Sequence, residues 1–273
     1  MPRDKNEATA KRREQARQLC LRGKFREALR FLRLASPRPR TITADQLCLW
    51  NEFGMVCKYA GRLSAAERYY RLALRHSARH YEGPALDFFR ANLYHNLGGL
   101  EHSRHRFRRG EAYTRKALHL RCRAAGPDSL GAASDMAALG ALLDGQQRFA
   151  ESETLYRKAL RVYRREYGKS HAEIAVVLNN LAAVFQATAR EQVSRRYYQA
   201  ALRMKRKELG RSHPDVALSL NNLAMLEKRT GKWQAARFNL ACALTILRRS
   251  LGKNHPHTRA VRKNLADLER TGR

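Results

Sequence analysis

The sequence lacks any run of about eighteen apolar residues, so it contains no candidate for a membrane-spanning helix. Its first fourteen residues, MPRDKNEATAKRRE, are highly charged and have no apolar segment of the kind that a secretory signal requires. The five cysteines are widely spaced and form no CxxC pair, which argues against a zinc site. We therefore expect small buried cysteines, a reducing compartment and a cytoplasmic protein.

Acidic residues are scarce: 24 Asp and Glu stand against 55 Lys and Arg, which gives a formal net charge of +31. A charge of this size attracts acidic partners or polyanions, because most of the surface carries a positive potential. A compositional bias toward arginine on solvent-exposed faces is the alternative explanation. Hydrophobic residues make up 44% of the chain, which is enough to build a continuous core.

Motifs for catalysis are also missing. The sequence contains no glycine-rich phosphate loop, no GxSxG or HExxH motif, and no pair of carboxylates in a setting suited to acid–base chemistry. We therefore expect a protein that is not an enzyme and that binds no cofactor.

A fixed period is the main feature that the sequence does contain. Three histidines and three glycines each recur every 42 residues: His171, His213, His255, Gly168, Gly210 and Gly252. Such a period predicts a stacked array, in which each unit buries its apolar face only against its neighbours. The histidines are not expected to bind a metal, because successive layers of an array place them about 10 Å apart. We expect them to mark the starts of helices instead.

Each unit has the pattern of two helices joined by a tight turn. In the unit that begins at His213, Leu220, Leu223 and Ala224 have the i, i+3, i+4 spacing of one buried helical face. The small residue after the second leucine recurs at Gly54, Gly98, Gly140, Ala182, Ala224 and Ala266. The second helix carries two further rows of small residues: Ala66, Gly110, Ser152, Ser194 and Ala236, and Ala73, Ala117, Ala159, Ala201 and Ala243. Side chains this small allow two helices to approach closely.

The leucine followed by glycine or alanine, the turn Gly231-Lys232-Trp233 and the alanine rows resemble the tetratricopeptide repeat. The period of 42 residues and the loops LGRSHPDVA and LGKNHPHTR resemble the kinesin light chain type of this repeat. The resemblance extends over about residues 45–271. It implies an all-α fold, a right-handed α-solenoid of about six helical hairpins with a C-terminal capping helix.

The expected boundaries are a basic N-terminal tail at 1–9 and a single solenoid at 10–271. The units are expected at 10–38, 46–78, 88–125, 130–168, 171–210 and 213–252, with the capping helix at 256–270. Residues 36–41 are expected to connect the first two units. The fifth unit departs from the pattern, because Ala189 replaces the turn glycine and Glu191 stands where an aromatic residue is expected. The geometry of its turn is therefore open.

Asparagines recur in one register of the first helices, although asparagine is a poor residue for a helix interior. The resemblance implies that the first helices line the concave groove, where such asparagines hydrogen-bond the main chain of an extended peptide. An amide offers both a donor and an acceptor, so it binds a peptide backbone whatever the peptide sequence. The alternative is that the asparagines repeat by duplication or bond the neighbouring helix.

The predicted groove residues are Asn51, Lys58, His95, Asn96, Asn179, Asn180, Asn221, Asn222, Lys228, Lys263 and Asn264. Further along the same helices, His102 and Arg270 could add positive charge to the groove. Two units are exceptions: Ala137 and Ala138 lack the amides in the fourth, and Gln186 replaces the charge in the fifth.

A basic cluster in the third hairpin supports a different class of partner. It comprises Arg104, Arg106, Arg108, Arg109, Arg115, Lys116, Arg121 and Arg123, and within the hairpin only Glu101 and Glu111 oppose it. Such a cluster binds phosphates through counterion release. No nucleic-acid motif accompanies it, and a solvated face is the alternative interpretation.

The leading hypothesis is a non-catalytic scaffold that binds an extended, acidic peptide segment of a protein partner in the concave groove. The alternative is the binding of nucleic acid or another polyanion through the basic surface. A third hypothesis is a regulatory module of a larger assembly, or a self-associating array. Proteins with such repeats serve many unrelated functions, so the fold does not choose between these hypotheses.

Overall fold

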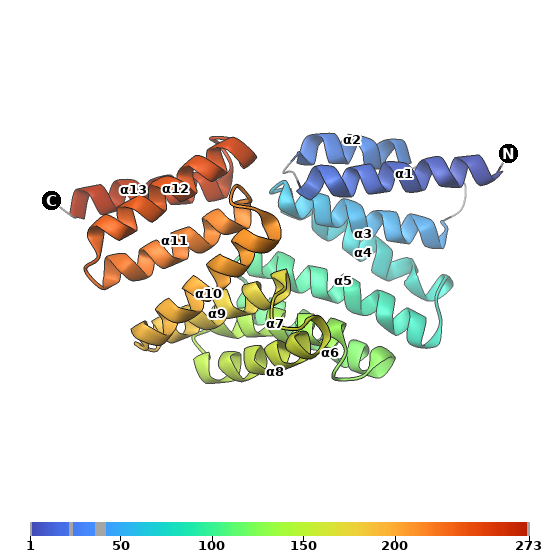
Figure 1. The fold of residues 1–273 in the computed structure, drawn as a ribbon. Coiled ribbons are helices and arrows are strands. Elements are labelled where there is room, and N and C mark those ends of the chain that lie inside the picture. The colour runs from blue at the N-terminus through green and yellow to red at the C-terminus, as the bar shows by residue number, and fades with distance from the viewer. Residues whose placement is uncertain (1, 22–23, 36–41, 272–273) are drawn as a thin grey trace. The chain divides into compact units, whose positions relative to one another are not determined.

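The computed structural model describes residues 2–21, 24–35 and 42–271, and its regular elements there are all helical (Figure 1). The helices are α1 (Pro2–Leu21), α2 (Phe25–Ala35), α3 (Ala44–Tyr59), α4 (Leu63–His76), α5 (Gly83–Ser103), α6 (Phe107–Ala125), α7 (Leu130–Asp144), α8 (Phe149–Tyr167), α9 (Ala172–Ala187), α10 (Glu191–Leu209), α11 (Pro214–Arg229), α12 (Trp233–Leu251) and α13 (Pro256–Thr271). A short 3-10 helix, η1 (Ser77–Arg79), follows α4. Because these ranges contain no strand, the predicted all-α class is confirmed. The predicted connector at 36–41 lies outside the described residues.

The chain divides into two compact units, Met1–Gln146 with α1 to α7 and Gln147–Arg273 with α8 to α13. In the first unit, α1 packs on α2, α3 on α4 and α5 on α6. In the second, α9 packs on α10 and α11 on α12, and α13 packs on both α11 and α12. Each unit is thus built from stacked helical hairpins. The expectation of one solenoid over 10–271 stays a prediction.

The first helices of the hairpins lie next to one another within each unit. In the first unit α5 contacts both α3 and α7, and in the second unit α11 contacts both α9 and α13. We call this surface the first-helix face of each unit. Side chains that point out between neighbouring first helices are therefore brought together from residues more than forty positions apart in the sequence.

The first helix begins earlier than the sequence suggested. Helix α1 starts at Pro2, whereas residues 1–9 were assigned to a tail and the first unit was expected to start at residue 10. The physical reason is composition, because the segment is rich in Ala, Glu, Lys and Arg and has no glycine or proline after Pro2.

The turn of the hairpin that α9 and α10 form has regular geometry despite its unusual residues. Ala189 adopts the left-handed backbone with φ 58°, as Gly231 does in the next hairpin with φ 73°. The backbone N–H of Arg190 donates to the carbonyl oxygen of Phe185 at 2.8 Å and closes the turn. The Arg190 guanidinium also lies 4.4 Å from the centre of the Phe185 ring. The chain therefore accepts the strain of a non-glycine residue at positive φ, and the turn packs without an aromatic residue at Glu191.

The predicted small residues lie where two helices approach most closely. A Cβ atom added to Gly54 on α3 would come within 2.3 Å of the Tyr70 ring on α4. A Cβ atom on Gly98 of α5 would lie 2.1 Å from the hydroxyl oxygen of Thr114 and 3.3 Å from the carbonyl oxygen of Gly110, both on α6. These distances are well below van der Waals contact, so the hairpins need glycine at these positions.

Each unit has its own apolar core. The first contains the fully buried Tyr70, Leu93 and Leu100. The second contains Leu240 and Leu247 between helices α11, α12 and α13. Among the described helices, none combines the length and the apolar character needed to cross a membrane.

Two adjacent glycines on α5 test this packing. Gly98→Ala should lower the free energy of unfolding by about 1–3 kcal/mol, because its methyl group overlaps Thr114 and the α6 backbone. Gly99→Ala should raise it by up to about 1 kcal/mol, because alanine favours the helix and the methyl group meets only the end of the flexible Lys58 side chain. Urea unfolding followed by circular dichroism measures both changes. Equal effects of the two substitutions would contradict the close approach.

Candidate functional site

A chain of asparagine amides crosses the first-helix face of the second unit. The Asn264 amide on α13 donates to Asn221 Oδ1 on α11 at 2.9 Å. The Asn221 amide donates to the neighbouring Asn222 at 3.5 Å, and Asn222 donates to Asn179 Oδ1 on α9 at 3.4 Å. We call Asn179, Asn180, Asn221, Asn222 and Asn264 the amide row. Its members link three consecutive first helices. Bonding to the neighbouring helix was one of the alternative explanations for the repeated asparagines.

The amide row keeps hydrogen-bonding groups that the helices do not use. Asn180 is half-buried on α9 and makes no side-chain hydrogen bond within the described chain. The carbonyl oxygen of Asn179 accepts from Asn222 and from the Ser219 hydroxyl, whereas its two N–H donors are not used by the described residues. Asparagine carries two amide donors and two acceptor sites, so the row presents unsatisfied groups at the surface.

The first unit repeats the same link once. Asn96 Nδ2 on α5 donates to Asn51 Oδ1 on α3 at 2.8 Å. The adjacent His95 was also predicted to line the groove, but its ring Nδ1 lies 2.7 Å from Asp135 Oδ1 on α7. His95 therefore connects two first helices as the asparagines do.

Behind His95 lies a buried ion pair that the sequence did not reveal. Asp135 is 0% exposed, and its second oxygen accepts from Arg121 Nε of α6 at 3.2 Å. The same guanidinium donates to Asn92 Oδ1 at 2.9 Å and lies 4.9 Å from the centre of the Phe88 ring. A buried guanidinium needs this full set of partners, because burial removes its water.

The positive groove residues differ in their surroundings. The Lys58 ammonium group lies against Gly99 of α5, and burial lowers the pKa of Lys58. Burial lowers the pKa of His102 as well, with a smaller contribution from the charge of Lys58. Lys228 is half-buried and Lys263 is exposed, and neither has an acidic partner among the described residues.

Two acidic residues accompany this positive row. Arg270 forms an ion pair with Asp267 on the same helix. Asp144 was missed, although it lies 42 residues after His102 and 42 before Gln186, so the period alone could have placed it in the row. Burial raises the pKa of Asp144. The Gln186 carbonyl oxygen accepts from the Tyr198 hydroxyl at 3.2 Å, so this side chain is committed to its own hairpin.

Most residues of the predicted polyanion cluster are neutralised by acids, some in the same hairpin and some in neighbouring hairpins. Glu67 on α4 accepts from Arg104 at 2.6 Å and lies 3.5 Å from Arg109. Arg123 pairs with Asp87. Arg115 pairs with Glu111 in its own hairpin, as expected, at 2.8 Å.

Arg121 must be removed from the cluster, because it is buried and paired with Asp135. Lys116 lies 5.8 Å from the centre of the Tyr94 ring. Arg106 and Arg108 are exposed and have no acidic partner in the part of the chain that the structure describes. These three residues are what remains of the predicted basic cluster. No group of three or more His, Cys, Asp or Glu side chains in the described ranges could hold a metal ion.

The chain matches one protein-family model over several overlapping ranges. The family model for the tetratricopeptide repeat matches residues 89–165, 139–207, 173–249 and 215–273. Together these matches span 89–273, well over half of the chain. No curated protein matches the sequence.

Three solved structures with the same fold are similar to the chain at low sequence identity. BtubC (BKLC) from P. vanneervenii is 19% identical, with 92% of this chain and 94% of that chain covered and a TM-score of 0.60. A putative kinesin light chain from Podosopora anserina with nearly identical TPR-like repeats is 14% identical, with 75% and 96% covered and a TM-score of 0.55. NprR in complex with its cognate peptide NprX is 12% identical, with 96% and 72% covered and a TM-score of 0.70. At these identities the likeness is one of fold.

Two aspartate–arginine pairs that differ in burial test the buried network. Asp135→Asn leaves the Arg121 guanidinium buried without a counter-charge, so the free energy of unfolding should fall by about 3–5 kcal/mol. Asp87→Asn removes the partner of Arg123, whose side chain is 62% exposed, and should cost less than about 1 kcal/mol. Urea unfolding of both variants measures the difference. A loss at Asp135 no larger than that at Asp87 would show that the network does not hold α6 and α7 together.

Proposed function

The chain belongs to the tetratricopeptide repeat family, and we propose that it is a non-catalytic scaffold that binds an extended peptide segment of a protein partner on its first-helix face. The observation that carries this proposal is the amide row of the second unit. Its asparagines recur in one register of α9, α11 and α13, yet they leave amide donors and acceptors unused at the surface. A peptide main chain presents the complementary groups at regular intervals.

Three further observations support a peptide ligand, and the last two favour one of acidic character. NprR, which has the same fold, was solved in complex with its cognate peptide NprX. Lys228 and Lys263 lie on α11 and α13, the helices that carry the amide row, and the described residues provide no acid to neutralise them. With a net charge of +31, the chain as a whole favours the approach of an acidic segment.

Asn180 gives the sharpest test, because its loss breaks no side-chain hydrogen bond among the residues that the structure describes. Short random peptides selected from a displayed library on the full chain should bind Asn180→Ala about tenfold more weakly, which corresponds to the loss of one or two hydrogen bonds to the ligand. The matched control is Gln199→Ala, which removes an exposed amide from α10, a second helix. It should leave peptide binding unchanged.

Stability and peptide composition complete this test. The unfolding midpoint of Asn180→Ala should equal or slightly exceed that of the unmodified chain, because alanine is the better helix former. Selected peptides should also be enriched in Asp and Glu. If Asn180→Ala binds the selected peptides as well as the unmodified chain does, the assignment of the first-helix face is wrong.

Binding of a polyanion is the second candidate function. It is favoured by Arg106 and Arg108, which remain exposed without acidic partners at the start of α6. The pairing of the other arginines makes this surface smaller than the sequence indicated. Arg106 and Arg108 could contact successive phosphates of a nucleic acid, although nothing in their arrangement reads a base sequence.

The salt dependence of nucleic-acid binding tests the second candidate. Replacing Arg106 and Arg108 together by glutamine should weaken binding of double-stranded DNA and reduce the slope of log K against log salt concentration by about 2. Arg123→Gln is the control, because that guanidinium already pairs with Asp87 at 3.2 Å, and its effect on the slope should be smaller. Fluorescence anisotropy at several salt concentrations gives the slopes. An unchanged slope in the double variant would exclude this surface as the DNA-binding site.

A further inference from the structure

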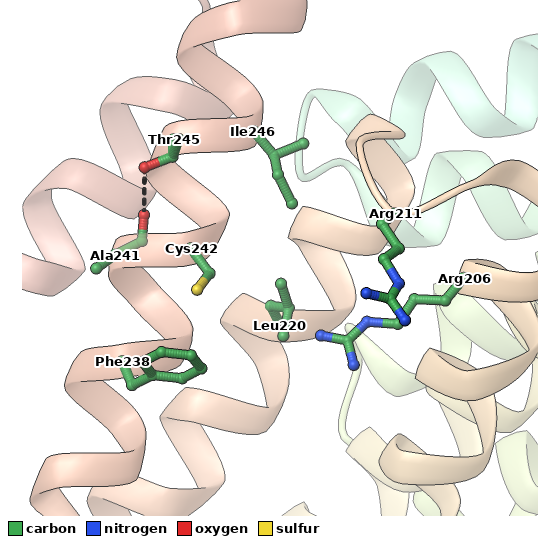
Figure 2. Close-up of a pocket in the computed structure, with 8 residues that line it drawn as sticks. All are labelled: Arg206, Arg211, Leu220, Phe238, Ala241, Cys242, Thr245 and Ile246. Atoms are coloured by element: carbon green, nitrogen blue, oxygen red, sulfur yellow. Dashed lines mark hydrogen bonds between the residues drawn. The ribbon is translucent and has the colours of Figure 1, made fainter.

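The second unit has a cleft lined mainly by its second helices, and none of its lining residues belongs to the amide row. Its volume is about 560 Å³, and it is lined from three neighbouring elements. Figure 2 shows Phe238, Cys242 and Ile246 along α12, facing the guanidinium groups of Arg206 and Arg211, with Leu220 of α11 between them. The cleft therefore has an apolar wall and a cationic wall.

The apolar wall is a departure from the repeat. Phe238, Ala241 and Thr245 occupy successive turns of the outer surface of α12. The residues 42 positions earlier, on α10, are Arg196, Gln199 and Arg203, and those 84 positions earlier, on α8, are Thr154, Arg157 and Arg161. At these three positions α12 therefore lacks the arginines that the preceding hairpins carry.

Stacking of the hairpins does not require this change. The Phe238 side chain is 69% exposed, whereas the residues that pack α12, such as Leu240 and Leu247, are fully buried. The ring of an exposed phenylalanine beside a cleft contributes favourable free energy only when a ligand covers it and removes it from water.

The cationic wall has no counter-charge of its own. Arg206 belongs to the last turn of α10 and Arg211 to the loop that follows, and both are exposed. Both guanidinium groups line the cleft (Figure 2), and neither has a hydrogen bond or an ion pair with the described residues. Two guanidinium groups that line one cleft both favour a carboxylate placed between them, and a carboxylate can accept hydrogen bonds from each.

We propose that this cleft is a second binding site, specific for a peptide segment in which a large apolar side chain stands next to an aspartate or glutamate. The apolar side chain packs on Phe238 and Ile246, and the carboxylate lies between Arg206 and Arg211. This site is separate from the amide row and does not depend on the function proposed for that row.

A protein segment fits this cleft better than a lipid or a second copy of the chain. The apolar wall is only two to three helical turns long and is surrounded by arginines, which suits one side chain rather than a long acyl tail. The strongly positive chain also repels a second copy of itself. Aromatic and arginine side chains are the residues that contribute most to protein–protein contacts.

Cys242 provides a direct readout, because this half-buried thiol lines the cleft. The probe is a short blocked peptide with phenylalanine between two glutamates, added to the full chain during alkylation with N-ethylmaleimide. Mass spectrometry follows each cysteine separately. Saturating peptide should slow the alkylation of Cys242 about tenfold and leave that of Cys122, a half-buried cysteine in the other unit, unchanged.

Variants of the protein and of the peptide test the two walls in turn. Replacing Arg206 and Arg211 together by glutamine should raise the half-protecting peptide concentration at least about tenfold, and peptides with glutamine in place of glutamate should show the same loss. Phe238→Thr, which introduces the residue that α8 has at the matching position, should act similarly and leave the circular dichroism spectrum unchanged. Arg164→Gln is the matched control, because Arg164 occupies the place of Arg206 in the preceding hairpin.

Four outcomes would overturn the proposal. The peptide could fail to protect Cys242, or the glutamine peptide could protect it as well as the glutamate peptide does. Protection by decanoate without protection by the peptide would assign the cleft to an anionic lipid. A dimer in light scattering that Phe238→Thr dissociates would assign it to a second copy of the chain. Asn180→Ala should leave the protection intact, so failure of the amide row and failure of this cleft are distinguishable.

Discussion

The close approach of paired helices is the constraint on which the rest of this structure depends. At Gly54 and Gly98 there is no room for even one methyl group, because the ring of Tyr70 and the hydroxyl of Thr114 already occupy that space. Helices that meet this closely bury leucines such as Leu97, Leu223 and Leu240. The core is therefore made of many small contacts between neighbours and not of one central cluster. In a stack of this kind, one side of each helix is not needed for packing against its neighbours.

On the first helices that free side carries asparagine, and the proposed function gives the asparagines a second task besides joining helices. Part of their hydrogen-bonding capacity joins neighbouring helices, as between Asn264 and Asn221 or between Asn96 and Asn51. In Asn179, Asn221, Asn222 and Asn264 the remaining capacity is held in a fixed orientation by such bonds, whereas the Asn180 amide has no such bond among the described residues. An amide whose position is set by its neighbour loses less conformational entropy when it binds a ligand than a mobile one does. Contact between helices and recognition of a peptide are therefore compatible uses of one row.

The sequence was sufficient for features that repeat and insufficient for features that depend on two hairpins at once. The helical class and the small residues followed from the period of 42 residues, because each unit solves the same packing problem. The pairing of Arg121 with Asp135 did not follow, since it depends on how α6 and α7 meet. Nor did the neutralisation of Arg104 by Glu67, which lies 37 residues away on another hairpin. The cleft at Phe238 breaks the repeat, and only its surroundings show what the exposed ring faces.

We propose that an extended peptide contacts the first-helix face of the second unit, and in particular Asn180. The most direct measurement is the NMR spectrum of the asparagine side-chain amides in the ¹⁵N-labelled chain, recorded during titration with a selected acidic peptide. We expect the amide signals of Asn180 and Asn179 to shift in proportion to peptide occupancy. The signal of Asn239 on α12 should not shift, since this amide donates to Glu227 within its own hairpin. Unshifted signals from Asn179 and Asn180 at saturating peptide would contradict the proposal.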